Sequence, residues 1–209
     1  MGVSDEPEPC ERAATQSTAD ARPRGHVHTA TCYRSEADLL AVVVPFLQAG
    51  VEEGEPTLVS LDQPKADLLR AAVPGSSALT FLGMDEVYAR PAVAIRSYRE
   101  LLGGLVADGA RRIRVVGEVP RSGLGPTWDW WARYESAVNH LYDEFPLWSI
   151  CAYDTRVTPP HILDDVERTH PHLAHPDGRR PTGDRYVDPL SYLATPRSLA
   201  DHPLQRRAP

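Results

Sequence analysis

The stretch Arg111–Tyr153, RRIRVVGEVPRSGLGPTWDWWARYESAVNHLYDEFPLWSICAY, decides the fold. It begins with a short apolar run, Ile113–Val116, that is bounded by Gly and Pro and is typical of a buried strand. Residues 128–141 then place aromatic and aliphatic side chains at helical spacing, and Leu147–Tyr153 is a second apolar run. Strands this continuously apolar are typical of a parallel sheet that is covered on both faces.

The rest of the chain repeats this alternation. Further strands are predicted over His26–Tyr33, Pro56–Leu61 and Ala78–Leu82, and each is followed by a helical pattern. Ser35 is predicted to cap the first helix, and Gly50 is predicted to end it. About five alternations predict an α/β fold: a mostly parallel central sheet of about five strands with helices on both faces, a RecA-like or Rossmann-like three-layer sandwich.

The ends of the chain differ in composition from its middle. Residues 1–25 are polar, charged and interrupted by proline, which predicts a disordered leader. One folded domain is expected over residues 26–172, followed by a Pro/Arg-rich extension over 173–209. Within that extension, Tyr186–Leu193 is expected to pack back onto the domain.

Composition argues against several classes of partner. The 209 residues carry a net charge of -7 and no basic patch, so we expect no nucleic acid. The longest apolar stretch, Leu39–Leu47, is too short to span a bilayer, and the acidic N-terminus has no apolar signal core. Three widely spaced cysteines fit a reducing compartment better than a disulfide framework. These features together predict a cytoplasmic protein with no membrane partner.

The junction after the first strand opposes nucleotide binding. A phosphate-binding turn needs glycines so that backbone N–H groups can approach the phosphates. Residues 32–36 contain neither glycine nor lysine, and Glu36 adds a negative charge at that place. Gly123 and Gly125 lie between a strand and a helix, but the rest of a dinucleotide fingerprint is missing. No cofactor is therefore expected.

The carboxyl ends of the strands are the expected ligand site, because ligands of open α/β sheets bind there. Glu118 follows one predicted strand, while Cys151, Tyr153 and Asp154 end another. The helix between them offers further side chains to wall the same space, although core packing alone accounts for at least two of its three aromatic residues. These helix residues are Trp128, Trp131, Tyr134 and Glu135.

Two acidic positions leave alternatives open. Glu118 is either a hydrogen-bond acceptor or general base in a cleft, or a structural carboxylate. The structural role would pair it with Arg114, Arg121 or a helix N-terminus. Tyr134 and Glu135 are neighbours on one helix, so one must face the sheet and the other can face solvent.

Cysteine and histidine chemistry receives little support from the pattern. Cys151 lies in an apolar strand, where a cysteine is more often a small core residue than a nucleophile. Catalysis would need a histidine nearby, and His28 supplies one only if the two strands are adjacent. Four more histidines lie in a segment that Pro171 and Pro176 interrupt, which predicts a solvated loop and no metal site. They are His161, His170, His172 and His175.

A set of residues in a fixed order resembles a known family. It comprises His28 and Tyr33 in HTATCY, the segment DLLAVVVPFLQAG with Gly54 and Glu55, Arg114, Gly117 and Glu118 in RVVGE, Trp131, Tyr134, Glu135 and Asn139 in WARYESAVN, Cys151 and Tyr153 in ICAYD, and Thr169-His170-Pro171. Over about residues 26–172, these resemble the MEDS domain, the methanogen/methylotroph sensory domain of DcmR-type regulators. One departure is Thr31, which stands where many relatives carry a second histidine, and it weakens a paired-imidazole site at His28.

The resemblance implies a sheet similar to that of RecA-like ATPases, with the phosphate-binding loop lost. It also implies a non-enzymatic sensor of small, hydrocarbon-like molecules that acts in signal transduction or transcriptional control. The partner would act in trans and could be an anti-sigma-type kinase, and a homodimer stays open. The ligand site predicted on this basis contains no catalytic or metal-binding residue and consists of His28, Tyr33, Glu118, Trp131, Tyr134, Glu135, Cys151 and Tyr153.

Two other classes of function remain as alternatives. A small hydrolase or transferase would use Glu118 or Cys151 together with His28. A pure protein-interaction module would use the aromatic face of the helix over residues 128–141 as a docking surface. Exposure of Trp128 or Trp130 would favour the interaction module.

Overall fold

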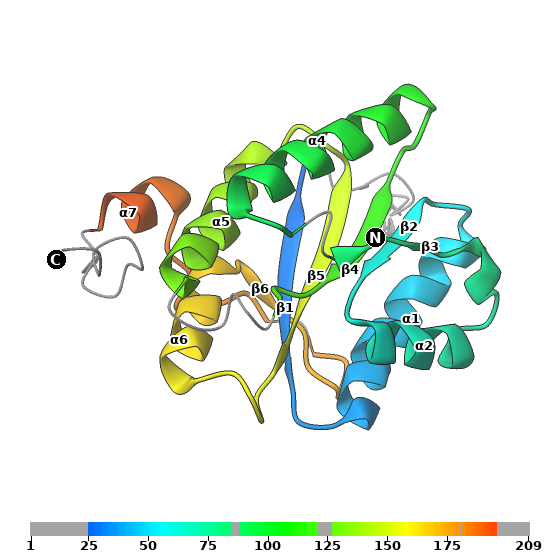
Figure 1. Cartoon of the computed structure of the whole chain (residues 1–209), viewed down its shortest axis with the longest axis horizontal. Coiled ribbons are helices and arrows are strands. Elements are labelled where there is room, and N and C mark those ends of the chain that lie inside the picture. The colour runs from blue at the N-terminus through cyan, green and yellow to red at the C-terminus, as the bar shows by residue number, and fades with distance from the viewer. Residues whose placement is uncertain (1–24, 85–87, 121–126, 180, 196–209) are drawn as a thin grey trace, which may run out of the picture.

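The computed structural model describes residues 25–84, 88–120, 127–179 and 181–195. Within these residues, six strands form one sheet in the order β3-β2-β4-β5-β1-β6 (Figure 1). Every neighbouring pair in the sheet is parallel, which confirms the predicted α/β class. The strands are β1 (Val27–Tyr33), β2 (Thr57–Ser60), β3 (Thr80–Phe81), β4 (Ile113–Gly117), β5 (Leu147–Asp154) and β6 (His172–Leu173).

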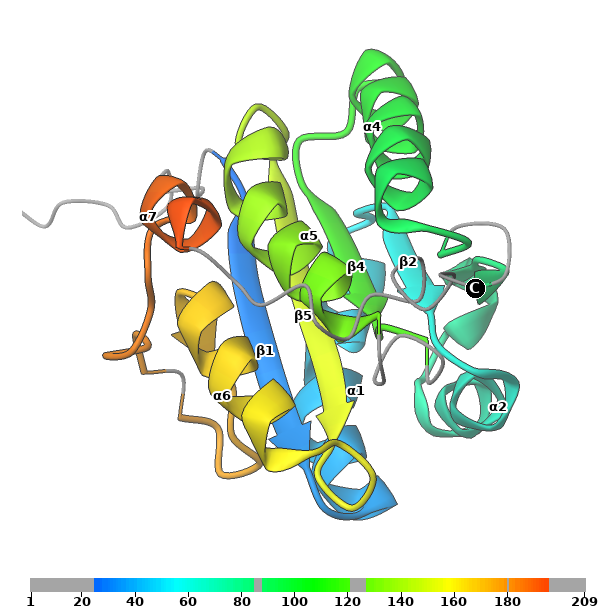
Figure 2. The same ribbon diagram turned by 60° about the vertical axis from the view of Figure 1, so that its left-hand side comes forward.

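Helices cover both faces of this sheet. They are α1 (Glu36–Glu52), α2 (Gln63–Ala72), α4 (Pro91–Ala107), α5 (Trp128–Leu141), α6 (Pro160–Thr169) and α7 (Pro189–Ala194), with a 3-10 turn, η2, over Ser76–Ala78. Helices α1 and α2 pack on one face, while α4, α5 and α6 pack on the other (Figure 2). No helix in the described part of the chain is both long and apolar enough to cross a bilayer.

Helix α1 begins where the sequence predicts and ends later. The Ser35 side chain accepts a hydrogen bond from the backbone N–H of Asp38, as an N-cap does. The predicted end at Gly50 is wrong, because the helix continues to Glu52. A Cβ atom at Gly50 would lie 2.8 Å from Cδ of Arg114 and closer still to the hydroxyl of Thr57. Gly50 therefore allows α1 to pack closely against the sheet.

Side-chain alternation along β1 and β5 decides what faces α5. On β5, Ile150 and Ala152 belong to the core under α1. The alternate residues of this strand, Cys151 and Tyr153, therefore point to the opposite face, which α5 covers. On β1, Ala30 belongs to the core under α5, and His28 shares its face. The sheet thus presents His28 and Cys151 to the same helix.

The last described helix returns to the domain, as the sequence predicts. Tyr192 of α7 is buried, and its hydroxyl donates a hydrogen bond to Asp165 of α6. The Nε1 atom of Trp128 donates to the other oxygen of the same carboxylate. One buried carboxylate therefore connects α5, α6 and α7.

The expectations for the leader before residue 25 and for Gly123 and Gly125 lie outside the described residues.

Candidate functional site

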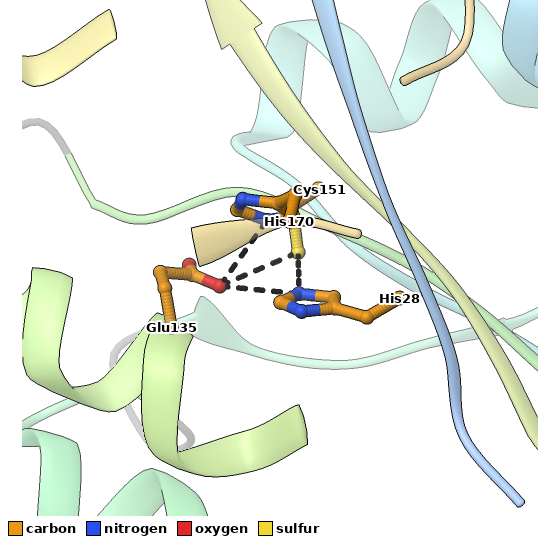
Figure 3. A group of neighbouring side chains, drawn as sticks. All are labelled: His28, Glu135, Cys151 and His170. Carbon is orange, nitrogen blue, oxygen red and sulfur yellow. Dashed lines mark hydrogen bonds and ion pairs between the residues drawn. The ribbon is translucent and has the colours of Figure 1, made fainter. Parts of the chain in front are cut away.

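Four side chains from four separate elements meet on the α5 face of the sheet. His28 comes from β1, Glu135 from α5, Cys151 from β5 and His170 from the residue after α6 (Figure 3). Their imidazole nitrogen, carboxylate oxygen and thiol sulfur atoms all lie within 4.8 Å of one another. We refer to these four residues as the buried cluster.

One carboxylate oxygen stands at the centre of the buried cluster. Oε2 of Glu135 lies 3.3 Å from Nε2 of His28 and 3.5 Å from Nε2 of His170. It also lies 3.7 Å from Sγ of Cys151, and that sulfur lies 3.3 Å from Nε2 of His28. Figure 3 shows these groups pointing toward one another from opposite sides of the site.

Further side chains fix the orientation of the cluster. Nδ1 of His28 lies 3.0 Å from Oδ1 of Asn139, and the amide nitrogen of Asn139 donates to the carbonyl oxygens of residues 135, 136 and 169. The hydroxyl of Tyr153 donates a 3.0 Å hydrogen bond to Oε1 of Glu135. The second oxygen of Glu135, Oε2, is therefore the one that faces the cluster.

Burial shifts the pKa values of the cluster. Burial, and then the charge of nearby His170, lower the pKa of His28 to about 4. Burial alone would raise the pKa of Glu135, but the close approach of the His170 and His28 imidazoles outweighs it, so the pKa of Glu135 lies well below its usual value. Burial and the neighbouring Glu135 raise the pKa of the Cys151 thiol well above its usual value. A catalytic cysteine needs the opposite shift, so this environment opposes nucleophilic catalysis by Cys151.

A small cavity of about 30 Å³ adjoins the cluster. His28, Glu135 and Cys151 form part of its wall. The remaining wall is mainly aromatic and aliphatic, so the cavity combines an apolar surface with one polar side. Its tyrosines are Tyr88, Tyr98, Tyr134 and Tyr142, and its aliphatic residues include Val115, Val138, Leu147 and Ile150.

An apolar groove lies outside this cavity, between α4 and α5. It encloses about 670 Å³ and is lined by residues that include Pro91, Ile95 and Trp130. Tyr88 and Tyr134 border both the groove and the inner cavity. These two rings therefore form a shared wall between the exterior groove and the buried cluster.

The structure brings most, but not all, of the predicted site residues together. His28, Glu135 and Cys151 meet in the cluster, and Tyr153 contacts it through Glu135. Tyr134 borders the cavity, and Trp131 lines the groove outside it. Tyr33 lies elsewhere, in the core under α1.

Glu118 borders the cavity but is held by structural partners. Its carboxylate accepts a 2.8 Å hydrogen bond from the backbone N–H of Asp62, the N-cap residue of α2. Nζ of Lys65 lies 2.9 Å from Oε1 and 2.8 Å from Oε2 of the same carboxylate. Of the alternatives for Glu118, the structure shows the contact with a helix N-terminus. Lys65 is an additional partner that the sequence pattern does not suggest.

The structure differs from two expectations about neighbouring side chains. Tyr134 and Glu135 are both buried, because Glu135 faces the sheet while the ring of Tyr134 packs against that of Tyr88 beside the groove between α4 and α5. His170 does not lie in a solvated loop: it is fully buried, and its ring centroid lies 4.1 Å from that of His28. A pair of imidazoles therefore does form at His28, although Thr31 supplies none.

The aromatic residues of α5 differ in burial: three lie in the core and one lies at the surface. Trp128, Trp131 and Tyr134 are all in the hydrophobic core, which confirms that core packing accounts for most of them. Trp130 is 46% exposed at the groove.

Two residues around the site, Tyr88 and Asn139, are not functional candidates from their local sequence. Only the family pattern draws attention to Asn139.

Comparison with known proteins agrees with this arrangement. The family model described as MEDS, MEthanogen/methylotroph, DcmR Sensory domain, matches residues 27–171. His28 and His170 therefore lie one residue inside the two ends of the match. The transcriptional repressor DcmR of Methylorubrum extorquens is 26% identical over 178 residues, which cover 80% of this chain and 66% of the repressor. The chain thus spans about two thirds of that relative's length, and it belongs to the MEDS family of sensory domains.

Proposed function

We propose that this chain is the sensory part of a regulatory system and that it binds a small, largely apolar molecule in the cavity beside the buried cluster. The observation that carries the proposal is the position of this cavity, between α5 and the sheet and next to His28, Glu135 and Cys151. Family membership and the similarity to a transcriptional repressor support the regulatory role.

The size of the cavity limits the ligand. A water molecule needs roughly 10–15 Å³ of such space, so about 30 Å³ admits only a few non-hydrogen atoms. Drug-sized ligands occupy pockets of roughly 300–1,000 Å³. The ligand expected here is therefore a compact molecule of one to three carbon atoms. Its apolar part would contact the tyrosines and its polar end would face Glu135 and Cys151.

Ligand binding would affect the surface through Tyr88 and Tyr134, the wall that the cavity shares with the groove. Tyr88 lies three residues before the first residue of α4, Pro91, and its ring borders both the cavity and the groove. A ligand that favours one position of the Tyr88 ring would change the shape of the groove, as a population shift requires. A regulatory protein acting in trans would read this change at the surface of α4 and α5.

Small-molecule binding can be tested with a panel of one- to three-carbon alcohols, aldehydes and halocarbons. Binding is measured by NMR chemical-shift changes and by the thermal unfolding midpoint of the purified chain. We expect some panel members to shift signals of residues around Val138 and Tyr134. Val115→Ile, which adds one methyl group to the cavity wall, and Val138→Phe should weaken that binding at least tenfold.

A matched control separates cavity filling from general destabilisation. Val106 on α4 is 40% exposed and lies away from the cavity, so Val106→Phe should leave binding unchanged. Absence of binding by every panel member to folded wild-type chain would contradict the proposal. Equal binding by wild type, Val115→Ile and Val138→Phe would contradict it as well.

A protein-interaction surface is a second candidate, and the exposure of Trp130 at the groove favours it. Large aromatic side chains in such positions are frequent anchors of protein interfaces. Trp130→Ala should then abolish regulation in cells while small-molecule binding persists. Normal regulation by this variant would remove the candidate.

A further inference from the structure

We infer that His28, Glu135, Cys151 and His170 form a binding site for one divalent transition-metal ion, with zinc as the ion that matches the donors best. The inference goes beyond small-molecule sensing and can hold even if the cavity binds no ligand. It depends on the distances between the donor atoms, on the hydrogen bonds behind the two imidazoles and on the charge of the site.

Four of the six separations between the donor atoms match those of a tetrahedral site. Zinc lies about 2.0–2.1 Å from imidazole nitrogen and about 2.3 Å from thiolate sulfur, so the edges of its ligand tetrahedron measure roughly 3.3–3.8 Å. Four donor pairs in the buried cluster measure 3.3, 3.3, 3.5 and 3.7 Å. Four of the six donor pairs are thus already at the spacing that a bound ion would impose, and all six pairs lie within 4.8 Å.

The hydrogen bonds of His28 direct one lone pair into the site. Asn139 uses its amide nitrogen to donate to three backbone carbonyls, so its Oδ1 is an acceptor toward Nδ1 of His28. Nδ1 must then carry the proton, and Nε2 presents its lone pair to Cys151 and Glu135. A metal-binding histidine has this arrangement, because an outer hydrogen bond fixes its tautomer.

His170 is prepared in the same way. Its Nδ1 lies 2.8 Å from the backbone oxygen of Val166, which can only accept, so Nδ1 donates. Its Nε2 is completely buried and has no hydrogen-bond partner among the described residues. That nitrogen lies 3.5 Å from Oε2 of Glu135. In the neutral ring, a lone pair therefore faces a carboxylate, which is repulsive unless a cation lies between them.

Charge balance supports a divalent cation. The Glu135 carboxylate is 2% exposed, and its ion-pair partners among the described residues are the two histidines alone. Burial of an uncompensated charge is costly. A divalent ion bound by one carboxylate, one thiolate and two neutral imidazoles would give a site of zero net charge.

The donor types select the class of ion. Thiolate and imidazole are ligands for zinc and other late transition metals, whereas magnesium and calcium prefer oxygen ligands alone. Three of the four donors, all but His170, border the inner cavity. A small molecule in that cavity could therefore approach the ion from the open side.

The first test measures metal in the wild-type chain and needs no variant. The full chain is purified without chelators, and its metal content is determined by inductively coupled plasma mass spectrometry. Metal-free chain is then titrated with Zn²⁺ and with Co²⁺. We expect one ion per chain, a higher thermal midpoint, and intense visible bands of tetrahedral cobalt with a thiolate-to-cobalt charge-transfer band.

Variants assign the ion to these four residues. Cys151→Ser should lose the charge-transfer band, and His170→Ala should bind cobalt at least 100-fold more weakly. Asn139→Ala, which touches no ion directly, should weaken binding about 10- to 100-fold through the freed His28 ring. Circular dichroism and cooperative unfolding show that each variant is folded, and Glu135→Gln serves as a second, conservative ligand variant.

Matched controls use residues of the same type outside the cluster. Cys32 is exposed and His172 lies on β6, so Cys32→Ser and His172→Ala should bind metal as the wild type does. Folded wild-type chain that neither retains nor binds Zn²⁺ or Co²⁺ would overturn the inference. Binding that Cys32→Ser or His172→Ala weakens as much as Cys151→Ser would also overturn it.

Discussion

His28 and Cys151 lie on neighbouring parallel strands, and the Nε2 and Sγ atoms of their side chains are 3.3 Å apart. The register pairs His28 with Ser149, so Cys151 lies two residues farther along β5 and on the same face of the sheet. This adjacency is the condition under which a cysteine–histidine pair could act. The raised pKa of the Cys151 thiol, however, opposes nucleophilic attack by this pair.

Gly117 should be sensitive to a single added methyl group. A Cβ atom there would lie 2.8 Å from the hydroxyl oxygen of Tyr88. Gly117→Ala should therefore displace Tyr88 and destabilise the domain by about 1–3 kcal/mol. Tyr88→Phe removes the opposing oxygen, so the double variant should be more stable than the sum of the single changes predicts. Urea unfolding measures all three.

Gly104 gives the matched control for this experiment. It lies inside α4, and a Cβ atom there would meet nothing within 4 Å. Gly104→Ala should leave stability unchanged or raise it by up to about 1 kcal/mol. A loss at Gly104 equal to that at Gly117 would show that the Tyr88 contact is not the cause.

Arg114 should be a costly charged residue to remove. Its side chain is 4% exposed, and its Nε lies 2.6 Å from Oε2 of Glu55, which is also largely buried. Arg114→Met should cost about 3–5 kcal/mol, because it leaves the Glu55 carboxylate without its close partner. Adding Glu55→Gln should recover part of that loss. Guanidinium unfolding midpoints provide the measurement.

A neighbouring arginine tests whether burial is the reason. Arg112 also approaches Glu55, at 3.5 Å, but its side chain is 17% exposed. Arg112→Met should cost less than about 1 kcal/mol. Equal losses for Arg112→Met and Arg114→Met would contradict the explanation based on burial.

Asp165 should hold α7 on the domain. Its two carboxylate oxygens accept 2.9 Å hydrogen bonds from Trp128 and Tyr192. Tyr192→Phe should cost about 1–2 kcal/mol, whereas Asp165→Ala should cost more, because it removes the acceptor of two buried hydrogen bonds at once. Hydrogen exchange should show faster opening of residues 189–194 in both variants. Unchanged exchange in that helix would refute this role.

The sequence predicts the elements that depend on local pattern. The apolar runs at Ile113 and Leu147 form strands β4 and β5, and Ser35 caps α1. The role of Gly50 is not predictable in this way, because it is a close contact with residues distant in the chain. Strand β6 has two residues and is too short to show a period.

The candidate site is predictable where its residues lie on regular elements. The apolar pattern around Cys151 predicts a strand, and His28 approaches that cysteine because β1 and β5 are neighbours in the sheet. The sequence does not predict the burial of His170, because Pro171 beside it is typical of exposed loops. That burial depends on α6 returning to the edge of β1, where β6 then pairs with Thr29 and Ala30. Long-range packing of this kind leaves no local signal.

Glu118 should prove mainly structural. Its carboxylate accepts the backbone N–H of Asp62 and pairs with Lys65. Glu118→Ala should cost about 1–3 kcal/mol, because the partly buried N–H of Asp62 and the Lys65 ammonium both lose their acceptor. Glu118→Gln keeps an acceptor and should cost less. Ligand binding that falls in Glu118→Gln without any loss of stability would instead place Glu118 in the binding site.

Alkaline pH should destabilise the domain through its buried tyrosines. Burial raises the pKa of Tyr98 from 10.0 to about 12. Between these values the unfolded chain loses a proton that the folded chain retains, so stability present below pH 10 falls as the pH rises toward 12. The slope should be about 1.4 kcal/mol per pH unit for this residue. Tyr98→Phe should reduce the slope of stability against pH by about this amount. An identical slope in wild type and variant would contradict the assignment.

The place of β1 in the sheet has a consequence for synthesis on the ribosome. This strand comes first along the described chain, yet it lies between β5 and β6, so that Val27 pairs with Trp148. Until β5 has left the exit tunnel, β1 has neither of its hydrogen-bonding neighbours. Such a high contact order predicts slow folding and a nascent chain that exposes an apolar strand. The protein should consequently depend on chaperones more than an α/β domain whose first strand pairs with the next one made.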